Sequence, residues 1–306
     1  MGKILLFGQA KFGERVFAGL RERGHEILAV AVPPPRAGRP PDPLEQAARE
    51  AGVPVISRRS YKDEEAVRLL EPERADLGVL AYVTQIIPRR ILDAPKFASV
   101  CFHPSLLPAY RGGSAINWQI IRGETRGGVT LFRPDDGIDS GPIYLQRELE
   151  IGPDDSAGSY YYGKVFDVGV EATLEAVELI LSGRAEAVPQ DETRATYDPL
   201  CRDEHAAIDW RRPTKEVHDL IRGCDPSPGA HCLWQGQRLR FYGSRRAADR
   251  PAASPGTVLG ISEEGIEVAT GDGSVRLAKM RAEGAKLPAA EAARSLGIEP
   301  GSVLGV

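Results

Sequence analysis

Residues 1–103 alternate between short apolar runs and helical segments, and this alternation restricts the fold more than any other feature. The apolar runs occupy residues 3–8, 26–32, 53–58, 76–83 and 98–103. Segments such as 12–25 and 62–75 lie between them and carry apolar residues at helical spacing. Apolar strands that alternate with helices predict an α/β fold around a mostly parallel sheet. Ligands bind such sheets at the carboxyl ends of the strands.

The pattern changes further along the chain. A helix is predicted over 114–124, a two-stranded extension over 127–137 and 141–151, and a long amphipathic helix over 159–183. Residues 186–203 show no periodicity and indicate a linker. Beyond it, short strands separated by glycines, such as 238–243 and 265–271, predict a small β-barrel. We therefore expect a domain over 1–203, which includes the linker, and a barrel domain over 204–306.

Composition excludes several classes of protein. The 306 residues carry a net charge of -4, which argues against a protein that coats nucleic acid. No apolar run reaches the ~18 residues of a membrane span, and the first run is too short for a signal peptide. We expect a cytoplasmic protein with no membrane partner. The four cysteines, which form no CxxC pair, are expected to be reduced, and we expect no metal site; a zinc site would need an unusual spacing among Cys224, His231 and Cys232.

The turn after the first predicted strand argues against a nucleotide site. Its sequence, "GQAKFGE", has Ala10 where a dinucleotide-binding turn has its middle glycine. It also lacks the Gly-Lys-Ser or Gly-Lys-Thr of a phosphate-binding loop. A dinucleotide oxidoreductase and a nucleoside triphosphatase are therefore both disfavoured.

His103 lies where an α/β sheet places its chemistry. It ends the fifth predicted strand and begins "HPSLLPAYRGG", a stretch stiffened by two prolines. Asp139 lies in a second loop, "RPDDGIDSGPI", flanked by glycines that permit a tight turn. A carboxylate near an imidazole orients it and favours its charged form, so the two residues form a candidate acid–base pair. The alternatives are an ordinary loop histidine and a turn-forming aspartate.

The two loops together resemble a known signature. "HPSLLPAYRGGSAINWQIIRGE" followed by "GGVTLFRPDDGIDSGPI" is similar to the folate-dependent formyltransferases, which include methionyl-tRNA formyltransferase. The resemblance extends over essentially the whole chain and is greatest to the amino-terminal hydrolase domain of 10-formyltetrahydrofolate dehydrogenase. It implies a Rossmann-like domain that binds 10-formyltetrahydrofolate as co-substrate, and an OB-like carboxy-terminal barrel.

The resemblance also implies a catalytic trio of Asn, His and Asp. The His and Asp correspond to His103 and Asp139, but Cys101 stands at the position of the Asn. In the family, attack on the formyl carbon gives a tetrahedral intermediate whose oxygen accepts hydrogen bonds. Alternation along the strand predicts that Cys101 and His103 face the same side. Cys101 is then an apolar filler, a weak donor to the formyl oxygen, or a nucleophile that takes the formyl group as a thioester.

Further site residues follow from the resemblance alone. The pterin of the folate is expected between two loops, at Tyr82, Gln85, Ile86 and Ile87 and at Asp135, Asp136, Gly137 and Ile138. Ser105 and Asn117 are expected near the substrates. Arg111 either meets the acceptor, sets the loop, or forms a surface ion pair.

Several functions remain compatible with these features. The first is formyl transfer to a small amine, ranked ahead because no dehydrogenase or carrier domain is attached. The second is transfer to water or a thiol, as in a 10-formyltetrahydrofolate hydrolase. The third is a folate-binding or sensing protein without activity. A tRNA acceptor is less favoured for an acidic chain, although Arg238, Arg240, Arg245 and Arg246 cluster in the sequence.

Overall fold

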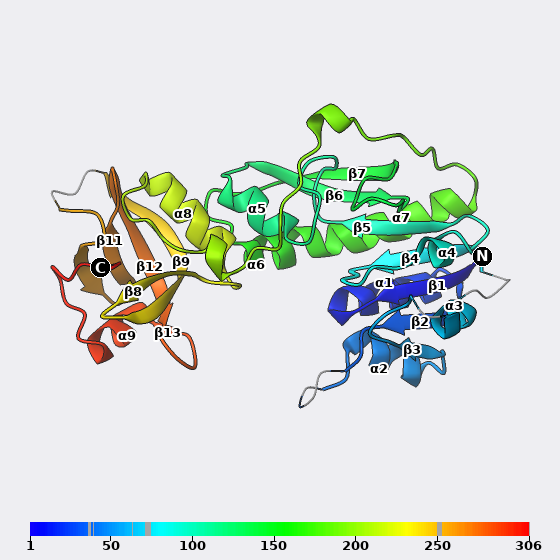
Figure 1. Ribbon diagram of the computed structural model, residues 1–306, viewed down its shortest axis with the longest axis horizontal. Helices are drawn as coiled ribbons and strands as arrows, with labels where there is room; N and C mark the ends of the chain where they lie inside the picture. The colour runs from blue at the N-terminus through cyan, green and yellow to red at the C-terminus, as the bar shows by residue number, and fades with distance from the viewer. Residues whose placement is uncertain (36–37, 39, 63, 71–74, 250–252, 306) are drawn as a thin grey trace. The chain divides into compact units, whose positions relative to one another are not determined.

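The structure is a computed structural model that describes residues 1–35, 38, 40–62, 64–70, 75–249 and 253–305 (Figure 1). The chain divides into two compact units. The first unit comprises Met1–Gly112, Gly128–Leu149 and Lys164–Tyr197. The second unit comprises Gly113–Gly127, Glu150–Gly163 and Asp198–Val306.

A seven-stranded sheet forms the centre of the first unit. The sheet and the helices around it are β1 (Lys3–Gly8), α1 (Ala10–Glu22), β2 (Glu26–Val32), α2 (Pro43–Glu50), β3 (Val55–Ser57), α3 (Glu64–Leu70), β4 (Leu77–Ala81), α4 (Arg89–Leu92), β5 (Ser99–His103), β6 (Arg126–Phe132), β7 (Ile143–Glu150), α7 (Phe166–Leu181) and the short 3-10 helix η2 (Glu192–Arg194). The predicted helix over 62–75 corresponds to α3; its residues 63 and 71–74 lie outside the described residues.

The strand order is β3-β2-β1-β4-β5-β6-β7. The strands from β3 to β5 pair in parallel, and β6 pairs with β5 in the antiparallel direction. The predicted mostly parallel sheet and its extension are therefore confirmed. The strand order changes direction between β1 and β4, the point at which open α/β sheets bind ligands outside the strand ends. His103 closes β5, the strand beside β4, opposite Thr130 of β6.

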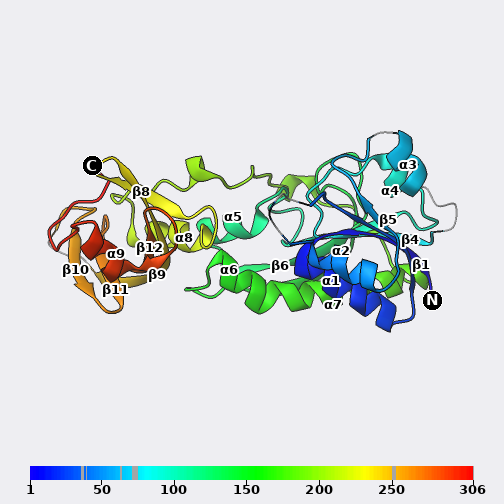
Figure 2. The same cartoon turned by 90° about the horizontal axis from the view of Figure 1, so that it is seen from below.

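Helices cover both faces of this sheet, with α1, α2 and α7 on one face and α3 and α4 on the other (Figure 2). On the first face the ring of Phe102 lies 4.4 Å from that of Phe12, centroid to centroid. The other face buries a cluster that contains Phe7, Leu80 and Ile91, and Cys101 packs against that cluster. Cys101 and Phe102 thus point to opposite faces, as alternation along a strand requires.

The second unit contains a six-stranded antiparallel sheet. Its elements are α5 (Ala115–Ile121), α6 (Ala157–Tyr160), the π-helix η1 (Tyr161–Val165) that continues toward α7, η3 (Asp203–His205), α8 (Thr214–Gly223), β8 (Ala230–Trp234), β9 (Gln237–Asp249), β10 (Val258–Ser262), β11 (Gly265–Ala269), β12 (Gly273–Arg281), β13 (Leu287–Pro288) and α9 (Ala289–Ser295). The order is β10-β11-β12-β9-β8, and β13 pairs with β12. The sheet confirms the predicted strands, whereas α8, α9 and β8 were not predicted. Closure into an OB-like barrel stays a prediction.

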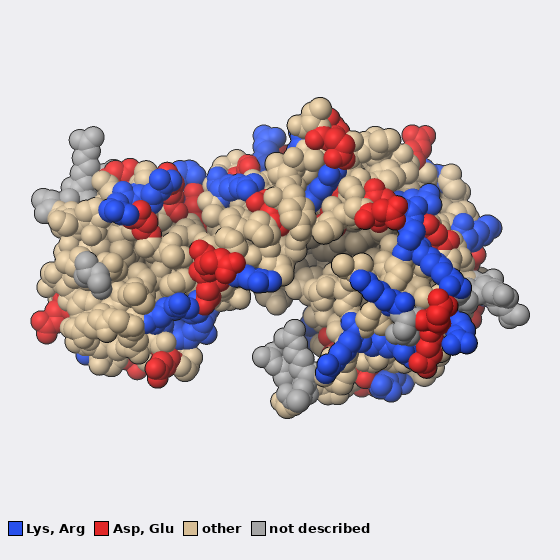
Figure 3. Space-filling model, in the orientation of Figure 1, with Lys and Arg blue, Asp and Glu red and all other residues tan. Residues whose placement is uncertain are grey.

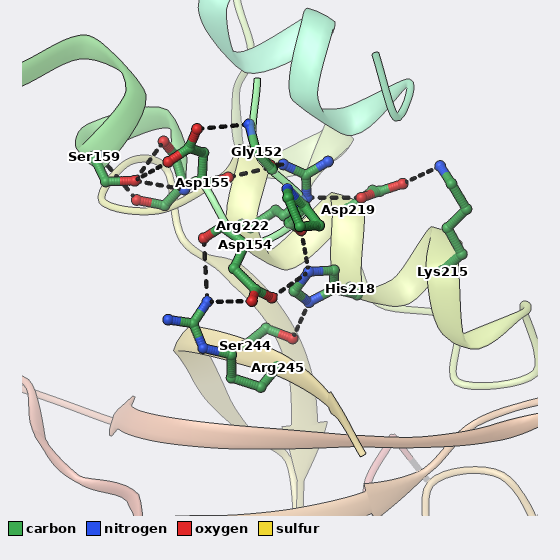
Figure 4. A network of polar contacts seen from close by, with 12 residues as sticks. Gly152, Asp154, Asp155, Ser159, Lys215, His218, Asp219, Arg222, Ser244 and Arg245 are labelled. Carbon is green, nitrogen blue, oxygen red and sulfur yellow. Dashed lines mark hydrogen bonds and ion pairs between the residues drawn. The ribbon is translucent and has the colours of Figure 1, made fainter. Parts of the chain in front are cut away.

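A buried polar network lies in the second unit and joins the segment 152–159 to α8 and β9 (Figure 4). Arg222 donates to the Asp219 carboxylate at 2.7 Å and to the carbonyl oxygens of Gly152 and Asp155 at 3.2 and 2.9 Å. The His218 ring lies 2.9 Å from the Pro153 carbonyl oxygen through Nε2 and 3.0 Å from the Ser244 hydroxyl through Nδ1. A carbonyl oxygen only accepts, so Nε2 carries the hydrogen and Nδ1 accepts from Ser244 in the neutral ring.

His218 should make the stability of the protein depend on pH. Burial lowers its pKa; Arg222 lowers it further, whereas the Pro153 carbonyl, Asp219 and Asp154 oppose the shift. The folded state therefore binds this proton less readily than the unfolded state, whose histidine has a pKa of about 6.5. We expect the stabilisation to be complete above that pH and to decrease as the pH falls below it. Urea unfolding at pH 5 to 8 should show a smaller acid-side decrease in a His218→Gln variant than in the wild type. Equal decreases in both proteins would contradict this assignment.

Candidate functional site

His103 is a buried histidine held in one orientation at the carboxyl end of β5. Its Nε2 lies 2.8 Å from the Tyr110 carbonyl oxygen. Because that oxygen can only accept, Nε2 carries a hydrogen, and the other ring nitrogen is left to exchange protons. This nitrogen, Nδ1, faces Oδ2 of Asp139 at 3.4 Å. The distance is long for a hydrogen bond, as is common for catalytic pairs before substrate binds.

Asp139 reaches His103 from the loop between β6 and β7. Its Oδ2 also accepts a hydrogen bond from the backbone N–H of Gly112 at 2.8 Å. The backbone of Asp139 has a φ of 55°, in the left-handed region that few non-glycine residues adopt. The loop is tight, since a Cβ on Gly141 would lie 1.8 Å from the Arg133 carbonyl oxygen. The structure therefore brings the two predicted catalytic residues together; their catalytic role stays a prediction.

A residue that the sequence did not single out, Gln190, supports this loop. Its Nε2 donates to the carbonyl oxygens of Asp139 and Gly141 at 2.8 and 2.7 Å. Its Oε1 accepts from Arg111, which also donates to both carboxylate oxygens of Glu192. Gln190 lies in the segment predicted as a linker, where no periodicity or motif marks it.

Arg111 and Ser105 make their contacts within the protein, although both were expected near substrate. Arg111 is only 9% exposed, and its guanidinium is engaged by Gln190 and Glu192. Of the three roles considered for it, the contacts favour setting the loop. Ser105 is fully buried and donates from Oγ to the Ala109 carbonyl at 2.6 Å. Their contacts with substrate stay predictions.

Asn117 belongs to the second unit. Its amide donates to the carbonyl oxygens of Gly223 and Ser227 at 2.7 and 3.0 Å, which ties α5 to the end of α8. These contacts give Asn117 a structural role within its own unit. The expected substrate contact stays a prediction.

Cys101 is surrounded by apolar side chains and also feels the negative charge of Asp139. It packs against the hydrophobic cluster that contains Leu80, and its Sγ lies 3.7 Å from the Phe102 carbonyl oxygen. Burial raises the pKa of its thiol well above the usual range, and the negative charge of Asp139 raises it further. A thiol that stays protonated at neutral pH is a poor nucleophile. The environment therefore favours Cys101 as a filler over a residue that forms a thioester.

The helix that follows the first predicted folate loop contacts the second predicted folate loop. A guanidinium nitrogen of Arg89, at the start of α4, is 3.9 Å from a carboxylate oxygen of Asp136. Large apolar side chains are exposed on both loops, with Tyr82 at 42%, Ile86 at 74% and Ile138 at 55%. Such side chains suit the flat face of a pterin ring. The exposed apolar side chains are thus compatible with the predicted folate position, and Ile138 directly precedes Asp139 in the chain.

The other predicted folate residues shape these loops. Gln85 donates from Nε2 to the carbonyl oxygens of Arg58 and Arg59. Asp135 accepts from the Gly137 N–H and from the Ser140 hydroxyl, which closes the turn that leads to Asp139. Ile87 is buried in the cluster beneath α4, so its side chain belongs to the core.

Two cavities of different size lie in the first unit. One of about 10 Å³, lined by Gly8, Gln9, Tyr82 and Gln85 among others, holds at most one water molecule. A larger cavity of about 380 Å³ lies against the histidine loop and is lined by Leu106, Leu107, Pro108, Ala109, Gln146, Glu148 and Arg194. Within the described part of the chain, no cluster of His, Cys, Asp or Glu side chains is arranged to hold a metal ion.

The start of α1 is already occupied by a carboxylate. Both oxygens of Asp42 accept from the backbone N–H of Ala10, at 3.0 and 2.8 Å. A dinucleotide-binding fold places the pyrophosphate at this helix terminus. The fixed negative charge of Asp42 would repel that group, which supports the exclusion drawn from the sequence of the turn.

Comparison with known proteins places this geometry in a family. A family model for formyl transferase matches residues 2–177, and one for the formyl transferase C-terminal domain matches residues 201–296. Mitochondrial 10-formyltetrahydrofolate dehydrogenase of Mus musculus is 38% identical over 275 residues, which cover 88% of this chain and 30% of that protein. The chain therefore spans less than a third of the length of that relative.

A second relative matches along its whole length. Methionyl-tRNA formyltransferase of Geobacter sulfurreducens is 35% identical over 309 residues, 99% of this chain and 96% of that protein. Among solved structures, HypX from Aquifex aeolicus in complex with tetrahydrofolic acid shares the fold, with a TM-score of 0.71 and 23% identity over 96% of this chain and 47% of that one. In the part of the chain that is described, no helix has the length and apolar character of a membrane span. From the two matched models and the full-length relative, the chain belongs to the formyl transferase family.

Proposed function

We propose that this protein transfers the formyl group of 10-formyltetrahydrofolate to an amine, with His103 and Asp139 as the catalytic pair. The observation that carries the proposal is the 3.4 Å approach of His103 Nδ1 to Asp139 Oδ2 at the carboxyl end of β5. The folate would lie against Tyr82, Ile86 and Ile138, whose side chains are exposed; Ile138 directly precedes Asp139 in the chain.

The geometry assigns each residue a step. Asp139 accepts the proton that the amine loses as its nitrogen bonds to the formyl carbon. The electron pair of the carbonyl double bond moves to the formyl oxygen, where His103, protonated at Nδ1, donates a hydrogen bond. A placed donor of this kind contributes about 2.7 to 4 kcal/mol. When the intermediate collapses, the electron pair on the oxygen re-forms the carbonyl double bond and the bond from carbon to N10 breaks. N10 takes up the proton that Asp139 accepted from the amine, so that tetrahydrofolate and the formylated amine leave.

Two observations bear on the acceptor. The relative that matches along its whole length is a formyltransferase, which supports an amine. The similarity to 10-formyltetrahydrofolate dehydrogenase supports water as the second candidate. A folate-binding protein without activity is the third candidate, and the intact His103–Asp139 pair weighs against it.

A tRNA acceptor receives little support from the arginines of the second unit. Arg238 and Arg240 both donate to Asp203, and Arg245 pairs with Asp154. On the face drawn in Figure 3, basic and acidic side chains are interspersed. The same proposal includes four further expectations. The protein is cytoplasmic, the reaction needs no metal ion, the two domains meet at residue 203, and the carboxy-terminal sheet closes into an OB-like barrel.

Removal of either catalytic residue should abolish turnover without abolishing folate binding. We expect His103→Ala and Asp139→Asn to lower the release of tetrahydrofolate from 10-formyltetrahydrofolate by about 100-fold or more. Calorimetric binding of 5-formyltetrahydrofolate should change little, because neither side chain forms the exposed apolar surface. Gln46→Ala, which removes one exposed hydrogen bond to Glu50 on α2, is the control. Normal turnover in both site variants would exclude this pair as the catalytic centre.

The same assay separates the candidate acceptors. Release without added amine identifies a hydrolase, and release that requires an amine identifies a transferase. Binding without release under these conditions indicates a sensing protein or an amine acceptor that was not supplied, and further amines are then tested.

Substitution of Cys101 distinguishes its three roles. If Cys101 is a filler, Cys101→Ala should keep turnover within about threefold, since one small side chain replaces another. Loss of turnover in Cys101→Ala together with a formylated thiol on the wild type, detected by mass spectrometry, would establish the thioester role instead. Cys101→Asn, which adds an amide donor beside His103, should raise the rate if it reaches the oxyanion.

A further inference from the structure

We propose that Gln190 is a positioning residue that holds Asp139 in the orientation required for proton transfer. This inference rests on the proposed function, because it gives Gln190 a role only if Asp139 takes part in the reaction. Gln190 does not touch His103 or the reacting atoms. It acts through the backbone on both sides of the Asp139–Gly141 turn.

The amide nitrogen of Gln190 donates to two carbonyl oxygens of the turn. Its Nε2 donates to the carbonyl oxygen of Asp139 at 2.8 Å and to that of Gly141 at 2.7 Å. Both hydrogens of the amide are therefore directed at the turn. The partners also fix the orientation of the amide, because carbonyl oxygens only accept and the arginine at its other end only donates.

Asp139 needs such a restraint. Its φ of 55° lies in a region that is sparsely populated for residues with a side chain. A relaxed turn would move the Asp139 carboxylate relative to His103 Nδ1. Residues held in such conformations persist when several contacts determine them together. Gln190 supplies two of these contacts and the N–H of Gly112 a third.

The other end of Gln190 links the turn to the histidine loop. Its Oε1 accepts from Nε and Nη2 of Arg111 at 3.2 and 2.8 Å. Arg111 is the neighbour of Gly112, whose N–H binds the Asp139 carboxylate. These four residues thus form a closed ring: the backbone joins Arg111 to Gly112, and hydrogen bonds join Gly112 to Asp139, Asp139 to Gln190 and Gln190 to Arg111. Glu192 accepts two further hydrogen bonds from Arg111, one from Nη1 and one from Nη2.

Two substitutions separate the two ends of the amide. Gln190→Ala removes every side-chain contact. Gln190→Glu keeps an acceptor for Arg111 but removes both donors to the turn and sets a carboxylate against two carbonyl oxygens. We expect each to lower kcat for tetrahydrofolate release by about 10- to 100-fold, as small misplacements of catalytic groups do, and to leave KM for 10-formyltetrahydrofolate within about twofold.

A double-mutant cycle tests whether Gln190 acts through Asp139. Single-turnover rates are compared for the wild type, Gln190→Ala, Asp139→Asn and the double variant, with Gln46→Ala as the matched glutamine control. In the Asp139→Asn background, Gln190→Ala should change the rate by less than about twofold, because the group that it positions is already gone. Multiplicative effects of the two substitutions would overturn the inference and assign Gln190 a general structural role.

The outcomes separate this inference from the proposed function. Normal kcat in both Gln190 variants, with turnover abolished in Asp139→Asn, would refute the positioning role alone. Normal turnover in Asp139→Asn would refute the proposed function and the inference with it. Melting temperatures are measured for every variant. If Gln190→Ala is unfolded at the assay temperature, Gln190→Glu, which retains the Arg111 contact, takes its place in the cycle.

Discussion

The burial of Phe102 against Phe12 is the contact on which the site depends. It fixes which residues of β5 point into each face of the sheet, and Cys101 and His103 consequently share the opposite face. A slip by one residue would exchange the two faces and bury the imidazole under α1 and α7. The chemistry at the strand end is therefore a consequence of core packing one residue earlier. The antiparallel pairing with β6, which sets Thr130 opposite His103, secures the same register from the other side.

Features that depend on residues close together in the sequence could be predicted from the sequence alone. Apolar runs predicted the strands, and a histidine at the end of a run beside a glycine-rich aspartate loop predicted the pair at the site. The sequence was not sufficient for Gln190, because that contact joins segments 51 and 49 residues apart and belongs to a stretch without periodicity. Motif membership also did not separate exposed from buried positions: Ile86 is exposed, whereas its neighbour Ile87 belongs to the core.

The departure at Cys101 is of interest because its surroundings suppress the reactivity of the sulfur. Desolvation and the charge of Asp139 both raise the pKa of the thiol, which favours the interpretation of Cys101 as an apolar filler. In the function proposed above, the site then relies on His103 as the donor to the formyl oxygen and on Asp139 as the base. Such a centre has less tolerance for a displaced carboxylate than one with an additional amide donor, which is consistent with the dense backbone support around the aspartate turn.

The carboxylate of Asp42 at the start of α1 has a consequence for the class of ligand that this end of the sheet can bind. In a sheet of this topology, a phosphate commonly binds at the N-terminus of the first helix. In this protein, the carboxylate of Asp42 occupies that position. With the Ala10 N–H already bound to Asp42, this helix terminus disfavours an anionic ligand. The discrimination against a phosphate at this helix terminus thus comes from one carboxylate of the protein and not from the strand order of the sheet.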